Sequence, residues 1–118
     1  CGSGEDDKLA KLQDEGKGTI GFANEKPYAY EENGELKGAA VDIAKAVFAE
    51  LGVEEVESEL LDFGQLISGL NAGQFDVITA GMAIRPDRCE NVAFGEPEMK
   101  YGAGLVVPNG NPQNLESY

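Results

Sequence analysis

The chain has 118 residues, 42% of them hydrophobic, and this length and composition predict one compact domain with an apolar core. No apolar run in the sequence is long enough to span a bilayer. Its 22 acidic and 9 basic residues give a net charge of −13, which repels phosphate backbones and argues against nucleic acid as a partner. The lack of histidine and the wide separation of two cysteines exclude Cys/His zinc sites and catalysis by a histidine base.

The first half of the chain predicts two helices, a strand and a tight turn. Residues 7–15 form a short amphipathic helix that ends at Gly16, and residues 18–23 form a strand. The pair Asn33-Gly34 is a strong tight-turn signal. Residues 39–51 give the clearest helix. Its apolar face comprises Val41, Ala44, Val47, Phe48 and Leu51.

The second half predicts three more strands and two helices. Residues 53–61 alternate apolar and acidic side chains, as in a half-buried strand. Asp62 is the expected N-cap of a helix, and residues 75–80 are expected in the middle of the sheet. The buried side of that helix comprises Leu66, Ile67 and Leu70. Pro86 opens a short helix, and residues 101–107 give another strand.

The resulting order β-α-β-α-β-α-β predicts an α/β fold, with a parallel or mixed sheet covered by helices on both faces. Ligands of such sheets bind at the carboxyl ends of the strands. This rule places residues 22–27 and 80–88 at one rim of the sheet.

The first rim segment combines aromatic rings with one acid. Phe22, Tyr28 and Tyr30 surround Glu25. Aromatic faces attract cations by about 0.5–2 kcal/mol each, and a carboxylate supplies the counter-charge. The alternative is that Phe22 belongs to the core and the tyrosines cover a loop.

The second rim segment combines an accessible backbone with a guanidinium. Gly81 lets a ligand approach the main chain, and Arg88 lies at the start of a helix, where it can grip a carboxylate with two parallel bonds. The alternative is a surface arginine that pairs with Asp87 or Glu90. Phe63, at another strand-to-helix corner, either completes an aromatic box or packs inward.

The cysteines leave two questions open. Cys1 and the small polar residues after it match the start of a mature lipoprotein, which predicts a lipid anchor at Cys1; the alternative is a boundary introduced in cloning. Cys89 is expected to pack as a small hydrophobic side chain, with a bridge to Cys1 as the alternative.

Taken together, these segments resemble the amino-acid-type family of ABC-transporter solute-binding proteins over residues 18–112. The likeness rests on residues 21–28 (GFANEKPY), 38–46 (GAAVDIAKA), 63–78 (FGQLISGLNAGQFDVI), 80–82 (AGM) and Arg88. Residues 22–30 (FANEKPYAY) and 87–97 (DRCENVAFGEP) are most similar to the ectoine- and hydroxyectoine-binding branch.

The resemblance implies one lobe of a type 2 periplasmic binding protein, a three-layer helix-sheet-helix unit with a mostly parallel sheet. Residues 1–17 would be a lipoprotein-like linker and short helix, 18–110 the first lobe, and 111–118 the start of a crossover to a second lobe that this chain lacks.

The resemblance also implies roles for individual residues. Arg88 would bind the ligand carboxylate, and the backbone of Ala80, Gly81 and Met82 would receive its nitrogen end. Phe22 and Phe63 would enclose a cationic ring that pairs with Glu25. Arg85 stands where the family usually has a hydroxyl residue; it either adds a second donor or points away.

The expected function is therefore capture of a small zwitterion, ectoine, hydroxyectoine or an amino acid, outside the cytoplasm for an ABC permease, without cofactor, metal or catalysis. A single lobe should bind weakly and expose apolar surface that favours pairing with another copy. Two alternatives remain: the sensory ectodomain of a receptor, and a dehydratase-like enzyme in which Glu25 is the acid-base group.

Overall fold

The computed structural model describes residues 6–117, and their side chains from Lys8 onward. The helices are α1 (Asp6–Glu15), α2 (Ala39–Glu50), the single 3-10 turn η1 (Phe63–Gln65), α3 (Leu66–Asn71) and α4 (Pro86–Cys89). The strands are β1 (Lys17–Phe22), β2 (Tyr30–Glu32), β3 (Glu35–Lys37), β4 (Glu55–Leu60) and β5 (Val77–Ile78).

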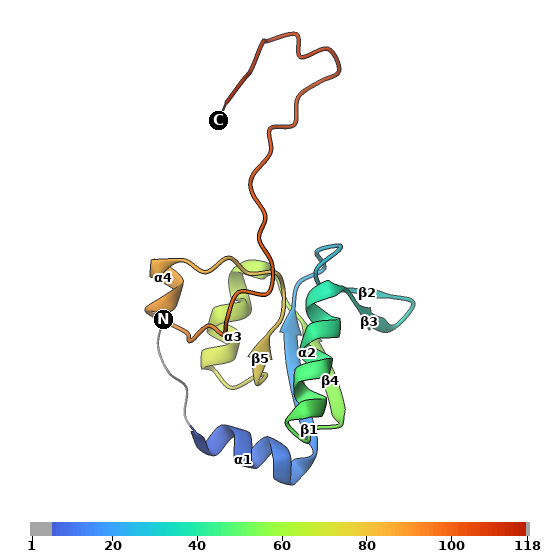
Figure 1. Cartoon of the computed structure of the whole chain (residues 1–118), viewed down its shortest axis with the longest axis vertical. Helices are drawn as coiled ribbons and strands as arrows, with labels where there is room; N and C mark the ends of the chain where they lie inside the picture. The colour runs from blue at the N-terminus through green and yellow to red at the C-terminus, as the bar shows by residue number, and fades with distance from the viewer. Residues whose placement is uncertain (1–5, 118) are drawn as a thin grey trace.

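The main sheet has three parallel strands in the order β4-β1-β5, and β2 and β3 form a separate antiparallel hairpin (Figure 1). Helix α2 packs on one face of β1 and α3 on the other, as the two core clusters show. The predicted α/β class with a parallel sheet between helices is confirmed. The expectation that residues 75–80 lie in mid-sheet is wrong. The central strand is β1, which pairs with β4 on one side and with β5 on the other, so the two-residue strand β5 lies at an edge.

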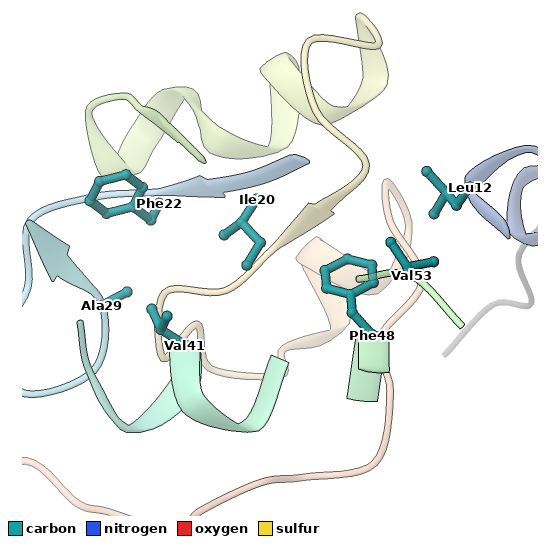
Figure 2. Close-up of a cluster of buried hydrophobic side chains, with 7 residues drawn as sticks. All are labelled: Leu12, Ile20, Phe22, Ala29, Val41, Phe48 and Val53. Atoms are coloured by element: carbon teal, nitrogen blue, oxygen red, sulfur yellow. The ribbon is translucent and has the colours of Figure 1, made fainter. Parts of the chain in front are cut away.

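One core cluster fills the space between β1 and α2. In Figure 2, Ile20 extends from β1 toward α2, and Phe22 of β1 belongs to the same cluster as Val41 and Phe48 of α2. Leu12, Ala29 and Val53 complete this cluster. Val47 of α2 and Leu51, which directly follows this helix, are exposed, so the apolar face predicted for residues 39–51 is only partly buried.

A second cluster lies on the opposite face of β1 and centres on the ring of Phe75. A Cβ atom at Gly21 of β1 would lie 2.4 Å from this ring, and one at Gly69 of α3 would lie 2.8 Å from it. Two glycines thus let an aromatic side chain pack directly between strand and helix. Leu66, Ala23 and Ala80 share the cluster, which therefore lies directly beneath the carboxyl ends of β1 and β5.

Polar contacts fix the edges of the sheet. The buried hydroxyl of Thr79 donates to the Ala40 carbonyl at 3.0 Å and ties the end of β5 to α2. Asp76 accepts the Thr19 backbone N–H at 2.8 Å and pairs with Lys8 of α1, also at 2.8 Å. These bonds connect β5 to three separate elements.

The predicted tight turn joins β2 to β3, with both Asn33 and Gly34 at positive φ. In the hairpin, the Glu32 carboxylate pairs with Lys26 at 3.0 Å and with Lys37 at 3.3 Å. Hydrogen bonds from Lys26 first, and then from Lys37, lower the pKa of Glu32. The same bond, which Lys26 donates to Glu32, raises the pKa of Lys26.

Three other expectations are corrected. Residues 101–107 form no strand: this segment leaves the domain (Figure 1, orange to red) without a neighbouring strand among the described residues, and Val106 is 95% exposed. The half-buried strand predicted for 53–61 is the edge strand β4, in which Leu60 is 49% exposed. Asp62 caps no helix through its side chain, since the turn η1 intervenes before α3.

Cys89 is disulfide-bonded, so the expectation that it packs as a free, small hydrophobic side chain is wrong. Its partner, and the predicted lipid anchor at Cys1, lie outside the described residues.

Candidate functional site

The carboxyl ends of the three parallel strands open on one edge of the sheet. The segments that follow β1, β4 and β5 form this rim, which comprises residues 23–28, 61–65 and 79–88. The main chain holds these segments together: Leu61 N–H donates to the Phe22 carbonyl at 2.9 Å, and Thr79 N–H donates to the Gly21 carbonyl at 3.1 Å. The rim predicted from the sequence is thus formed, with the loop after β4 as its third part.

One side of the rim is an acidic hollow of about 520 Å³. It is lined by Ala23, Asn24, Glu25, Leu60, Leu61, Asp62, Phe63 and Gln65. Within the described part of the chain, the carboxylates of Glu25 and Asp62 have no ion pair or hydrogen bond. The neighbouring cation, Lys26, is turned to Glu32 in the hairpin and lies 4.7 Å from the Tyr30 ring centroid. The negative charge of this hollow therefore remains available to a cationic group.

The other side is a smaller hollow of about 250 Å³ that carries a guanidinium. It is lined by Phe63, Gly64, Ile67, Met82, Asp87, Arg88 and Asn91. The Arg88 Cζ atom lies 5.4 Å from the Phe63 ring centroid, and its Nη1 donates to the Ala83 carbonyl at 3.0 Å. Cation–π contact and one hydrogen bond orient the guanidinium and leave most of its donors free for a ligand.

Arg88 forms none of the ion pairs that would make it an ordinary surface arginine, as far as the structure describes the chain. Asp87 instead accepts a bond from Arg85 Nε at 3.1 Å, and both of these side chains are exposed. The charge of Arg85 is therefore balanced by a carboxylate, whereas that of Arg88 is not balanced by any described residue.

A third part of the rim brings together Tyr28, Gly81 and Tyr101. The rings of Tyr28 and Tyr101 stack with centroids 5.3 Å apart and an interplanar angle of 28°. The Tyr101 hydroxyl donates to the Gly81 carbonyl. Gly81 has φ +64°, and a Cβ there would lie 2.8 Å from the Tyr28 ring, so glycine is required for this contact.

The structure brings most of the predicted site residues to this rim, but in three groups. Glu25 lines the acidic hollow, Arg88 and Met82 line the smaller one, and Phe63 lines both. Tyr28 and Gly81 line neither hollow and contact Tyr101.

Three predicted residues are less accessible or already engaged. Phe22 is 1% exposed and packs in the core beside α2, so the alternative interpretation of this residue holds and we leave it out of the site. Ala80 is buried and can offer only its backbone. Arg85 pairs with Asp87, as noted above.

Two residues of the rim, Asp62 and Tyr101, are not among the site residues predicted from the sequence. Asp62 was interpreted as a helix cap, yet it lines the acidic hollow beside Glu25. Asp62 is the second residue after β4, the same position that Asn24 has after β1, and this placement is a signal that could have identified it. For Tyr101 the sequence offers no such signal, because its contact with Tyr28 is a long-range one.

The described residues have neither a cluster of metal-ligating side chains nor a membrane-spanning helix. They contain no group of three or more His, Cys, Asp or Glu side chains placed to hold a metal ion. No helix among them has the length and apolar character needed to cross a membrane.

The model of the bacterial extracellular solute-binding proteins, family 3, matches residues 19–115. The chain belongs to this family. The match includes all three rim segments and Tyr101.

Similar proteins support the assignment. A probable amino-acid ABC transporter periplasmic-binding protein of Sinorhizobium fredii is 46% identical over 113 residues, which are 93% of this chain and 38% of that protein. The crystal structure of EhuB in complex with hydroxyectoine is 40% identical, with a TM-score of 0.72, over 75% of this chain and 35% of that one. A variant of domain 1 of TmArgBP, in its arginine-bound form, is 32% identical, with a TM-score of 0.73, over 81% of this chain and 75% of that one.

These likenesses confirm the fold of a type 2 periplasmic binding protein. The chain spans less than half the length of the full-length relatives that it matches. The matches also include an enzyme, an ancestral cyclohexadienyl dehydratase that is 28% identical with a TM-score of 0.71.

Proposed function

We propose that this chain is the ligand-gripping lobe of the solute-binding component of an ABC importer, and that it captures a small zwitterion outside the cytoplasm. The observation that carries this proposal is Arg88, a guanidinium oriented over an aromatic ring and left without a carboxylate partner among the described residues. Such a group is suited to a ligand carboxylate, which can accept two parallel N–H bonds.

The opposite charge lies across Phe63 from Arg88. Phe63 lines both hollows, so a ligand that rests against its ring can reach Arg88 with one end and Glu25 with the other. Asp62 adds a second carboxylate at the cationic end. A molecule with one carboxylate and one delocalised cation matches this arrangement in charge and polarity.

Ectoine and hydroxyectoine have this charge pattern, and arginine has it together with an additional ammonium group. The similar proteins include one in complex with hydroxyectoine and an arginine-bound domain, which supports both ligand classes for this chain. We expect weak binding by the chain itself, since open hollows cannot enclose most of a ligand's surface.

We further propose the arrangement around this lobe. Residues 1–17 form a linker and short helix, residues 18–110 form the lobe, and residues 111–118 lead toward a second lobe. The permease is the partner that receives the ligand, and the exposed apolar side chains of α2, which include Val47, favour weak self-association of the lobe.

Calorimetry and NMR titration with ectoine, hydroxyectoine, arginine and the other common amino acids test the proposed function. Arg88→Gln should weaken binding of the best ligand about 10- to 150-fold, the equivalent of a lost hydrogen-bonded charge pair of about 1.5–3 kcal/mol. Lys45→Gln, which removes one positive charge from the exposed surface of α2, is the matched control and should leave binding unchanged. A wild-type chain that binds no compound of the panel would sink the ligand assignment.

A variant and a matched control also test the acidic end of the site. Glu25→Gln should weaken binding of cationic ligands, whereas Glu54→Gln removes an equal charge from an exposed position outside the rim and should not. Arg85→Gln separates the two interpretations of that residue: an effect below twofold is expected, because its charge is already balanced by Asp87.

We also propose that the chain binds without chemistry, despite the dehydratase among the matched proteins. The sequence has no histidine, and no nucleophile with an adjacent base occurs in it. Incubation with prephenate or arogenate should give no product; turnover that disappears in Glu25→Gln would establish the enzymatic alternative instead.

A further inference from the structure

Tyr101 connects the C-terminal segment to the rim. Its ring stacks on Tyr28, and its hydroxyl reaches the carbonyl of Gly81, 20 residues earlier in the chain. No residue between α4 and Tyr101 forms a strand or helix, so this contact, rather than secondary structure, holds the segment at the rim.

The two groups that Tyr101 occupies are groups expected to receive a ligand. Tyr28 offers an aromatic face on the first rim segment, and Gly81 offers an unhindered backbone on the second. Neither of the two hollows is lined by Tyr28 or Gly81. Tyr101 therefore covers a third part of the rim, the Tyr28 ring and the Gly81 carbonyl, which lies outside both hollows.

The contact is of a kind that a ligand can displace. Tyr101 remains 55% exposed, and its bond to Gly81 lies at the surface. A solvent-accessible hydrogen bond of this type contributes little net free energy, because water replaces it when it opens. A ligand with an N–H donor and an apolar or cationic ring can offer Gly81 and Tyr28 the same two interactions.

We propose that Tyr101 is a further residue of the ligand site and acts as an intramolecular placeholder. In the ligand-free protein its ring covers Tyr28 and its hydroxyl bonds the Gly81 carbonyl. A ligand must displace both contacts to use these groups, so Tyr101 lowers the affinity of the lobe for its ligands. The loss is greatest for ligands that lack a donor for the Gly81 carbonyl. The inference rests on the proposed function, since it assumes that this rim binds a ligand.

The first test needs no ligand. In the 118-residue chain with ¹³C-labelled tyrosine, the aromatic signals of Tyr101, assigned with Tyr101→Phe, should be shifted upfield by the Tyr28 ring. Tyr28→Leu should remove this ring-current shift, while Tyr30→Phe should retain it. Signals of Tyr101 that do not respond to Tyr28→Leu would overturn the inference.

The second test measures affinity for the best ligand of the panel. Tyr101→Phe, which retains the ring and removes the hydroxyl, should tighten binding about two- to tenfold, and Tyr101→Ala should tighten it further. Val106→Ala, on the same segment and fully exposed, is the control and should match the wild type. Weaker binding by the Tyr101 variants would show a positioning role and overturn the placeholder, as would unchanged binding.

The two proposals fail in different ways. If the wild type binds a ligand and the Tyr101 variants bind no more tightly, only the placeholder is wrong. If the wild type binds nothing in the panel, the proposed function fails and the placeholder fails with it, whatever the ring-current shift shows.

Discussion

Replacement of Gly21 by alanine tests the packing beneath the rim. The added methyl would lie 2.4–2.5 Å from three carbons of the Phe75 ring, far inside van der Waals contact. The ring cannot retreat toward α3, because Gly69 faces it there with a similar lack of space. The backbone of β1 cannot shift either, since it is hydrogen-bonded to β4 on one side and to β5 on the other.

Overpacking of a well-filled core costs about 1–3 kcal/mol, and the absence of any free direction here places Gly21→Ala at the upper end. For a domain of this size, that loss corresponds to a fall in Tm of roughly 5–15 °C. The cost should shrink when Phe75 is first replaced by leucine, because the two substitutions share one contact.

Thermal and urea unfolding followed by circular dichroism measure the effect. Gly64→Ala is the matched control: nothing lies within 4 Å of its Cβ position, and it should change the free energy of unfolding by less than about 0.5 kcal/mol. If Gly21→Ala unfolds at the same temperature as Gly64→Ala, Phe75 does not pack against β1 as described, and the support assigned to the rim is wrong.

Three further predictions concern stability. Lys26 and Lys37 lower the pKa of Glu32, so the carboxylate stabilises the fold above the ordinary glutamate pKa and loses this effect as the pH falls through its lowered folded value. Glu32→Gln should therefore reduce the change of the urea midpoint between pH 6 and pH 3. A pH profile equal to that of the wild type would contradict the pairing. Leu66→Ala should cost about 2–5 kcal/mol, because the side chain is fully buried, and a loss below 1 kcal/mol in urea unfolding would refute that burial. Thr79→Val should cost about 0.5–1.5 kcal/mol, as it removes the bond to the first turn of α2; equal stability would show that this bond contributes nothing.

The parts of the fold that depend on local chemistry could be predicted from the sequence. Asn33-Gly34 adopts positive φ in a turn whatever surrounds it, and the helix over residues 39–50 follows from its own periodicity. The strand β1 and the rim after it followed from a short apolar run and the rule for parallel sheets.

The parts that failed depend on a partner distant in sequence. Residues 101–107 have the composition of a strand, but a strand needs a neighbouring backbone, and this segment has none among the described residues. Phe22 alternates correctly for a strand, but which face is buried is decided by the position of α2. The stack of Tyr101 on Tyr28 is set by the path of the chain after α4, which no local pattern encodes.

The side-chain Nε–H signals of the two arginines offer the most direct test of the central claim. The sequence contains only Arg85 and Arg88, so an ¹⁵N spectrum of this region holds two signals, each assigned by one substitution. When the best ligand of the panel is added, the Arg88 signal should shift and become protected from exchange, while the Arg85 signal, already bonded to Asp87, stays in place. Saturating ligand that leaves Arg88 unmoved would contradict the proposal that Arg88 grips the ligand carboxylate.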